Sequence, residues 1–194
     1  TVTVPQGSLL NPPFPSAVGV RHIAVTRICD VLNGALAEAL PDIVPSCGAG
    51  VNIPIVFAEP TDSNGDRNVI VVQPLVGGGG ARKGVDGING RAGGIINIGN
   101  NPVEAIESHA EIVIGRYGLR TGSGGPGRWR GGLGVELTFS ARIPGTQVLG
   151  RGADRYRFVP WGLFGGNAGA AARTVLNFGR PNVRDLGQFD MITL

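Results

Sequence analysis

Apolar residues in the first part of the chain recur at steps of three and four positions, starting just after His22. They are Ile23, Ile28, Val31, Leu32, Ala35, Leu36, Ala39 and Leu40. Because an α-helix completes a turn every 3.6 residues, this spacing places their side chains on one helical face. Pro41 lacks the N–H that a helix interior requires. We therefore expect one amphipathic helix that ends before Pro41, preceded by an extended, proline-rich segment.

Beyond this helix the apolar runs become short and rich in β-branched residues, which is typical of strands. The turn-forming stretch TDSNGD separates the first two runs, so they should pair as a hairpin. A brief second helix is expected near Asn101, with Asn101 as its cap, Pro102 at its first position and Glu104 completing a capping box. The predicted strands span residues 51–57, 69–72, 112–119, 135–141, 147–149 and 156–159.

Glycine is unusually frequent, with 34 residues, and it occurs among Val, Ile and Leu rather than in a polar low-complexity tract. The densest stretch is 77–94, GGGGARKGVDGINGRAGG, which leads into the apolar run 95–98. Such a distribution favours tight turns and bulges in an ordered β structure. The predicted fold class is α+β: an early amphipathic helix, then a β-rich, glycine-rich sandwich or distorted barrel.

The charge pattern narrows the range of partners. The formal net charge is only +3, and the basic residues are scattered along the chain. Neither a nucleic acid nor a membrane surface is therefore expected as a partner. The two cysteines, Cys29 and Cys47, show no metal-ligand spacing, and the first residues do not resemble a signal peptide. A cytoplasmic location is the prediction.

Segments in a fixed order carry a family resemblance that none of them carries alone. The chain reads VPQGSLLNPPFPSAVG, then GGGGARKGVDG, then NNPVEAIESHAEIVIGRYGLRTGSGGPGRWRGGLGVE, followed by FVPWGLFGGNAG. In this order they resemble the later portion of the hydantoinase B/oxoprolinase family. Its members include subunits or domains of 5-oxoprolinases, N-methylhydantoinases, caprolactamases, and acetone and acetophenone carboxylases. The chain departs from the family at Ala110, where a proline is usual.

The resemblance implies a component of an ATP-dependent enzyme that hydrolyses a cyclic amide or imide. A component of an ATP-dependent ketone carboxylase, or a non-catalytic assembly module, is the alternative. It also implies a hydantoinase A-type partner subunit that holds ATP and Mg²⁺ and phosphorylates the carbonyl oxygen of a small-molecule substrate.

The family begins with a region rich in Asp and His that binds a divalent metal, and nothing in this chain is similar to that region. No metal site is therefore expected within the chain. Residues 1–194 are predicted to be a fragment, truncated at both ends relative to the family. Such a fragment should depend on the remainder of its own subunit and be inactive alone.

The glycine segment is the first candidate site, because successive backbone N–H groups without side chains can bind an anion. One interpretation is that Gly78, Gly79 and Gly80, together with Arg82 and Asp86, line the cleft that receives a phosphorylated intermediate or a carboxylate. The other is that the glycines serve positive φ angles and close chain crossing. The segment matches neither a Walker motif nor a dinucleotide fingerprint.

Two further groups are candidates. Glu104 and Glu107 lie three residues apart, so on a helix they share a face and are suited to act as a general acid/base pair. The alternative is a capping glutamate and a structural ion pair. Arg128 and Arg130 in GRWRGG are expected to anchor a packed turn by pairing with Glu104, Glu107 or Glu136. In the other interpretation one of them, represented by Arg128, binds a substrate carboxylate or phosphate. The catalytic candidates are thus Asp86, Glu104 and Glu107.

Overall fold

The computed structural model describes residues 3–17, 19, 21–50, 52–91, 93, 96, 98–150 and 154–194. Its elements are α1 (His22–Leu36), β1 (Asn52–Ala58), β2 (Val69–Val76), α2 (Val103–His109), β3 (Ile112–Leu119), β4 (Val135–Ala141), β5 (Gln147–Gly150), β6 (Val175–Leu176), β7 (Arg184–Asp185) and β8 (Met191–Thr193). The predicted α+β class is confirmed. The sheets are open, so the barrel alternative was wrong.

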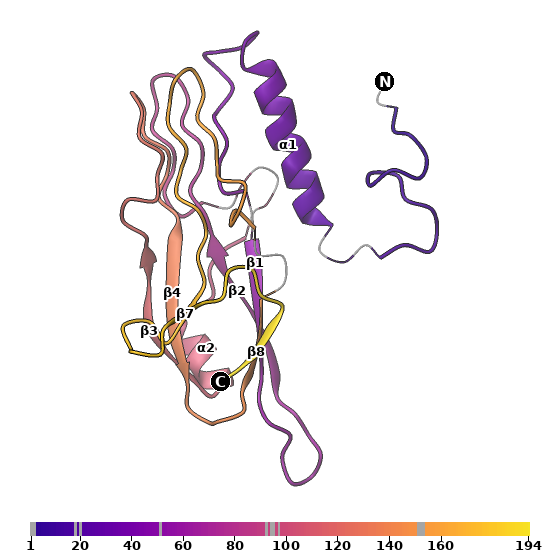
Figure 1. Ribbon diagram of the computed structural model, residues 1–194, viewed down its shortest axis with the longest axis vertical. Coiled ribbons are helices and arrows are strands. Elements are labelled where there is room, and N and C mark those ends of the chain that lie inside the picture. The colour runs from indigo at the N-terminus through magenta and orange to yellow at the C-terminus, as the bar shows by residue number, and fades with distance from the viewer. Residues whose placement is uncertain are drawn as a thin grey trace.

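The strands form a layered body in the lower half of the molecule (Figure 1). One sheet has the order β2-β1-β5-β8, and β3 pairs with β4 in a second, two-stranded sheet. A short β6-β7 pair stands apart from both. All pairings are antiparallel, and the predicted hairpin is the β1–β2 pair. The β3–β4 pair packs against the larger sheet, which is a sandwich-like arrangement.

Alternation along the strands explains which side chains enter the core between these sheets. Along β1, Ile55 and Phe57 are buried, as expected for the period of two in a strand. The ring of Phe57 contacts the ring of Phe139 on β4 edge to face, with centroids 4.9 Å apart. Helix α2 closes the core with Ile106. The buried cluster comprises Ile55, Phe57, Val72, Ile106, Ala110, Ile112 and Val148.

Several local predictions need correction. Helix α2 begins at Val103 with Pro102 in the cap position and no side-chain cap hydrogen bond there, so the capping box at Asn101 was wrong. Residues 156–159 form bends rather than a strand, because the chain turns at Arg155 with a φ of 66°. The strands β6, β7 and β8 were not predicted. The apolar run 95–98 lies partly outside the described residues.

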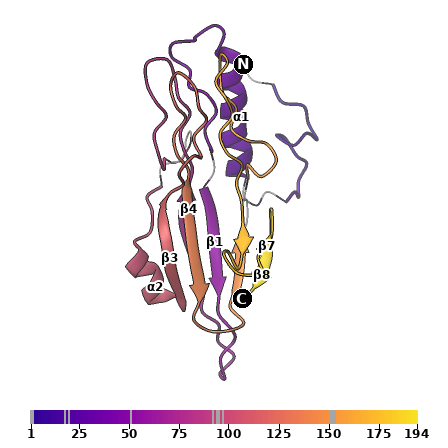
Figure 2. The same ribbon diagram turned by 60° about the vertical axis from the view of Figure 1, so that its left-hand side comes forward.

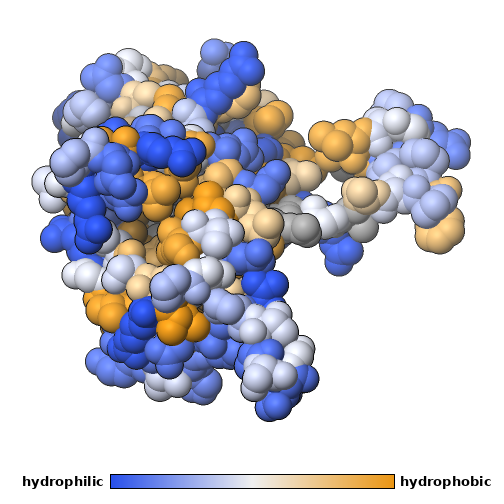
Figure 3. Space-filling view, turned by 60° about the horizontal axis from the view of Figure 1, so that its bottom comes forward, coloured by the Kyte–Doolittle hydropathy of each residue, from blue (hydrophilic) through white to orange (hydrophobic). Residues whose placement is uncertain are grey.

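Above the sheets, loops from five parts of the chain extend side by side (Figures 1 and 2). We call this region the glycine-loop end; it comprises residues 45–50, 77–91, 120–134, 154–158 and 160–172. Helix α1 lies along one side of it. Residues 3–17 form an extended arm that stands clear of the rest of the molecule (Figure 3).

Helix α1 packs against the glycine-loop end with its small and polar face. Thr26 and Ala37 are buried there, and Gly34 lies close to the indole of Trp161. The predicted apolar face is the opposite one, and its large side chains are exposed. The periodicity thus predicted the helix correctly, but the apolar face does not contact the described part of the chain.

Candidate functional site

The glycine-loop end is held together by hydrogen bonds between backbone groups of different loops. The N–H of Ala49 donates to the carbonyl of Gly78 at 2.9 Å, and the N–H of Gly79 donates to Ile88 at 2.8 Å. Gly132 in turn donates to the carbonyl of Gly79 at 2.9 Å. Further bonds join 131 to 125, 170 to 123 and 169 to 160. Segments far apart in sequence therefore form one continuous backbone stack.

Glycine is required in this stack because the chains approach too closely for a side chain. A Cβ on Gly78 would lie 1.9 Å from the carbonyl oxygen of Gly132, and one on Gly80 would lie 1.7 Å from that of Ser46. Both obstacles are backbone atoms, which cannot move aside as a flexible side chain does. Close crossing accounts for glycine at positions 78 and 80. An anion-binding role for the Gly78–Gly80 loop stays a prediction.

Asp86 fixes two glycine loops relative to each other. Its Oδ1 accepts a hydrogen bond from the backbone N–H of Arg130 at 2.8 Å. Asn89 does the same nearby, since its Oδ1 accepts from the N–H of Leu133 at 2.9 Å and from Nη1 of Arg130 at 3.2 Å. The carboxyl group of Asp86 is exposed on the surface. It is therefore held in place and still open to solvent.

Arg82 and Arg128 lie at the same end of the molecule, and both are exposed. The guanidinium of Arg128 sits over the ring of Trp129, 5.0 Å from its centroid. The predicted pairing of Arg128 or Arg130 with a glutamate was wrong in the described part of the chain. Arg130 donates instead to Asn89 and to the carbonyl of Gly131, while Glu136 pairs with Arg116.

Glu104 and Glu107 do share one turn of α2, but they lie at the other end of the strands. Strand β3 leads from α2 to the glycine-loop end, and its eight residues span about 25 Å. Glu107 is half-buried, and its Oε1 accepts a hydrogen bond from the N–H of Ile114 at 2.6 Å. Glu104 is exposed. The structure brings Asp86, Arg82, Arg128 and the glycine loop together, and it separates them from this pair of glutamates.

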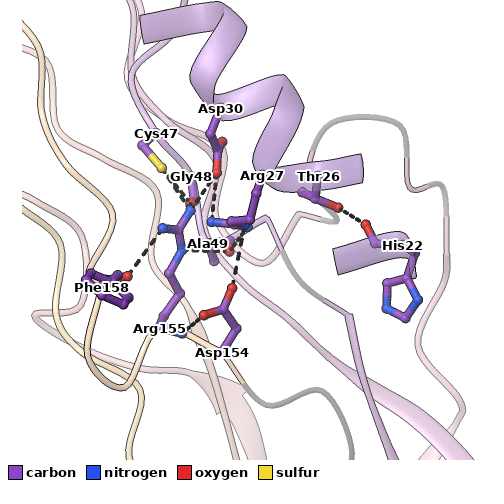
Figure 4. Close-up of polar contacts among 10 residues, drawn as sticks. All are labelled: His22, Thr26, Arg27, Asp30, Cys47, Gly48, Ala49, Asp154, Arg155 and Phe158. Atoms are coloured by element: carbon purple, nitrogen blue, oxygen red, sulfur yellow. Dashed lines mark hydrogen bonds and ion pairs between the residues drawn. The ribbon is translucent and has the colours of Figure 1, made fainter. Parts of the chain in front are cut away.

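A buried cluster of charges joins α1 to two of the loops (Figure 4). At its centre is Arg155, which is 8% exposed. Its Nη2 lies 2.8 Å from Oδ2 of Asp30 and 2.9 Å from Sγ of Cys47. The guanidinium also donates to the carbonyl oxygens of Gly48, Ala49 and Phe158. This one side chain holds the helix and both loops.

Electrostatics within the cluster follow from burial. Burial raises the pKa of Asp30 above its ordinary value, against the lowering effect of the Arg27 guanidinium, whose Nη1 lies 2.7 Å away. Burial, and secondly the charge of Asp30, raises the pKa of Cys47 to about 12. The thiol is therefore protonated at neutral pH and is a poor nucleophile. The arrangement suits a structural anchor.

A broad groove of about 1710 Å³ runs from the glycine loops along β4 towards the C-terminal segment. Among its lining residues are Arg128, Trp129, Phe139, Leu176 and Phe189. Small-molecule sites usually enclose about 300–1,000 Å³, so this groove is wider than a closed substrate pocket. Within the described ranges, no three His, Cys, Asp or Glu side chains lie together in a way that would hold a metal ion.

No sequence signal indicated the Arg155 cluster. Asp30 and Arg155 lie 125 positions apart, and neither belongs to a recognisable motif. A buried ion pair of this kind arises from tertiary contacts that periodicity does not report. Among the described helices, neither has the length and apolar character needed to cross a membrane.

Comparison with known proteins places the fold and the motifs in context. The family model described as Hydantoinase B/oxoprolinase matches residues 1–191. A protein of Pseudomonas sp. (strain NS671) that is assigned as one of the subunits of a D-/L-hydantoinase is 33% identical over 168 residues, which cover 87% of this chain and 27% of that protein. The beta subunit of the caprolactamase of Pseudomonas jessenii is 30% identical over 156 residues, 78% of this chain and 27% of that protein.

The fold also has a solved counterpart. A nucleotide-free structure of acetone carboxylase, an enzyme of ATP-dependent acetone carboxylation, matches 79% of this chain and 21% of its own, with a TM-score of 0.59 and 19% identity. This likeness shows the fold alone. The chain spans about a quarter of the length of the two curated relatives from Pseudomonas. With the family model matching nearly every residue, the chain belongs to the hydantoinase B/oxoprolinase family.

Proposed function

We propose that this chain is part of a subunit that opens the ring of a cyclic amide or imide in an ATP-dependent complex. The observation that carries the proposal is the match over residues 1–191, together with relatives at 33% and 30% identity that are named for hydantoin and caprolactam. Both compounds are cyclic amides. The proposed partner is a hydantoinase A-type subunit that holds ATP and Mg²⁺ and supplies the phosphorylated substrate.

We propose that the glycine-loop end binds the anionic group of that substrate. Exposed Arg82 and Arg128 provide positive charge there, and Asp86 is fixed by its bond to the Arg130 amide. A guanidinium binds a carboxylate or phosphate through charge-assisted hydrogen bonds. Backbone N–H groups of the Gly78–Gly80 loop complete the proposed contact. In this arrangement Asp86 moves a proton as the ring opens.

Glu104 and Glu107 form a second proposed acid/base pair, one turn apart on α2. They do not share the surface of Asp86, so they act on the substrate only if another part of the full-length protein places a second site against α2. The divalent metal of the family fits no group of side chains in the described part of this chain. We assign it to the remainder of the subunit, and we assign a cytoplasmic location to the complex.

The test uses the full-length subunit with its ATP-binding partner, and it measures ring opening of hydantoin, 5-oxoproline and caprolactam together with ATP hydrolysis. Asp86→Asn keeps an oxygen that accepts from the Arg130 amide but cannot transfer a proton. We expect it to lower kcat about 100-fold, within the range of general acid–base effects. Full activity of Asp86→Asn with loss of activity in Asp86→Ala would assign Asp86 a structural role only.

The arginines are tested by their effect on substrate binding. Arg82→Gln and Arg128→Gln are each expected to raise KM about tenfold, which corresponds to about 1.4 kcal/mol. Arg142→Gln is the matched control, because Arg142 is exposed just after β4, at the end of the strand far from the glycine loops. An equal effect in all three variants would mean that only the overall charge matters.

The acids on α2 are tested in the same assay. Glu104→Gln should lower kcat by a similar factor if the pair transfers protons, with Glu111→Gln, an exposed neighbour, as the control. Unchanged turnover of Glu104→Gln in folded protein would remove the pair from the mechanism. Ring opening by residues 1–194 alone would contradict the proposal as a whole.

A ketone carboxylase is the second candidate, favoured by the likeness to the acetone carboxylase fold. The same complex is supplied with acetone or acetophenone, bicarbonate and ATP, and incorporation of labelled carbon is measured. Carboxylation without ring opening of any cyclic amide would replace the first proposal with this one.

A further inference from the structure

Helix α1 is amphipathic, but its apolar side does not face the body. The side that packs carries Thr26, Arg27, Asp30, Gly34 and Ala37, which make contacts with the loops or are buried. With 100° between successive residues, the opposite side carries Val25, Ile28, Leu32 and Leu36, with Val31 at its margin. The side that faces away from the molecule is therefore the more apolar one (Figures 1 and 2).

These outward side chains are open to solvent. Val31 is 69% exposed, Leu32 55% and Leu36 45%. The stripe continues past the helix, where Leu40 and Ile43 are exposed as well. A contiguous apolar surface of this kind marks a place where another segment packs. No charged residue interrupts it, a composition that resembles the core of a permanent interface.

We propose that this outward face of α1 is covered by a further segment of the same polypeptide. In the hydantoinase and caprolactamase relatives the matched stretch is 27% of one protein, and in acetone carboxylase it is 21% of one chain. In those proteins most of the material available to pack against this fold belongs to the same polypeptide. The proposal rests on family membership and does not depend on which reaction the complex performs.

The arm that precedes α1 supports the same assignment. Residues 3–17 leave the body (Figures 1 and 3), and Leu9 and Phe14 on this arm are 88% and 99% exposed. Exposed large side chains on both the arm and the outward face of α1 need a cover that is present whenever the subunit is folded. A segment of the same chain meets this requirement at any protein concentration, whereas a second copy or a separate subunit does not.

Thiol labelling of the full-length subunit tests the proposal without disturbing the core. Cys29→Ala removes the half-buried native thiol of α1, and Leu32→Cys is added in that background. Ser63→Cys, on the exposed turn between β1 and β2, is the matched control. We expect a bulky maleimide to modify the thiol introduced by Leu32→Cys at least tenfold more slowly than the control thiol, without the partner present and at every protein concentration. Val31→Cys provides an independent second position.

The other occupants are distinguishable outcomes. Equally fast labelling of both thiols in the folded subunit would show an open face and overturn the proposal. Protection that appears only after the ATP-binding partner is added would assign the face to that partner. Protection that increases with protein concentration would assign it to a second copy. Failure of ring-opening activity would leave these labelling rates unaffected, so the two proposals are tested separately.

Discussion

Side chains fill the space between elements in the sheet half of the molecule, whereas in the glycine-loop end backbone lies directly on backbone. Phe57, Ile112 and Val148 are almost completely buried between the sheets. At the other end Gly78, Gly80 and Gly132 would place a Cβ within about 2 Å of a neighbouring carbonyl. The two halves therefore tolerate opposite changes. Removing atoms damages the first, and adding atoms damages the second.

This difference also separates two ways of stabilising a fold. The sheet half depends on removing apolar surface from water, which contributes roughly 25 cal/mol for each Å². The glycine-loop end has few large buried side chains and depends on hydrogen bonds between loops and on the Arg155 cluster. Its loops carry the proposed substrate-binding groups. A binding surface held by backbone bonds is rigid without needing a large core beneath it.

Adding one methyl group to the stack should have the largest effect. Gly78→Ala places a Cβ 1.9 Å from the carbonyl oxygen of Gly132, so two loops must separate. We expect a loss of more than about 4 kcal/mol of the free energy of unfolding, seen as insoluble protein or as a collapsed urea midpoint. Gly118→Ala is the control, because a Cβ there meets nothing within 4 Å. Equal stability of the two variants would contradict the close crossing.

Removing atoms from the sheet half should come next. Phe57→Ala leaves a cavity beside Phe139 and Val148 and should cost about 3–5 kcal/mol. The control is Phe178→Ala, since Phe178 is exposed and its truncation should change the unfolding free energy little. Urea unfolding followed by circular dichroism measures both. A small effect at Phe57 would mean that this core is poorly packed.

The sheet half was the more predictable of the two from sequence. Strands β3 and β4 span the predicted residues, because alternation and β-branched content are local signals. Residues 156–159 have the same composition, but the chain turns at Arg155 and does not pair there. The strands β6 and β7 have two residues each, which is too short for any periodicity.

The candidate site was predictable only in part. Glycine density identified the segment where the loops cross, and it led to Asp86, Arg82 and Arg128, which do lie together. Nothing local indicated that Glu104 and Glu107 lie at the far end of β3, since that depends on the direction of the strand. Likewise, periodicity identified α1 but not which of its faces packs, because that is decided by partners distant in sequence.

The junction between α1 and the loops gives the third effect. Arg155→Met removes the cation that pairs with Asp30 and leaves three loop carbonyls without their donor. Breaking a buried pair by deleting one partner costs about 3 kcal/mol or more. Arg157→Met is the control, because Arg157 is exposed. A midpoint equal to that of the control would show that the loops do not depend on Arg155.

The smallest effect should come from an exposed pair outside both halves. Nε of Arg173 lies 2.8 Å from Oδ2 of Asp185, and this hydrogen bond, followed by one from the N–H of Gly187, lowers the pKa of Asp185 below 3.8. A carboxyl group with a lowered folded-state pKa stabilises the protein above its unfolded pKa, and it loses this contribution as the pH falls through the folded value. Arg173→Gln should therefore lower the urea midpoint slightly at pH 7, and the difference should shrink as the pH falls below 3.8. High salt should reduce it at neutral pH, since the pair is open to solvent. A difference that grows on acidification would mean that Arg173 acts through some contact other than the Asp185 carboxylate.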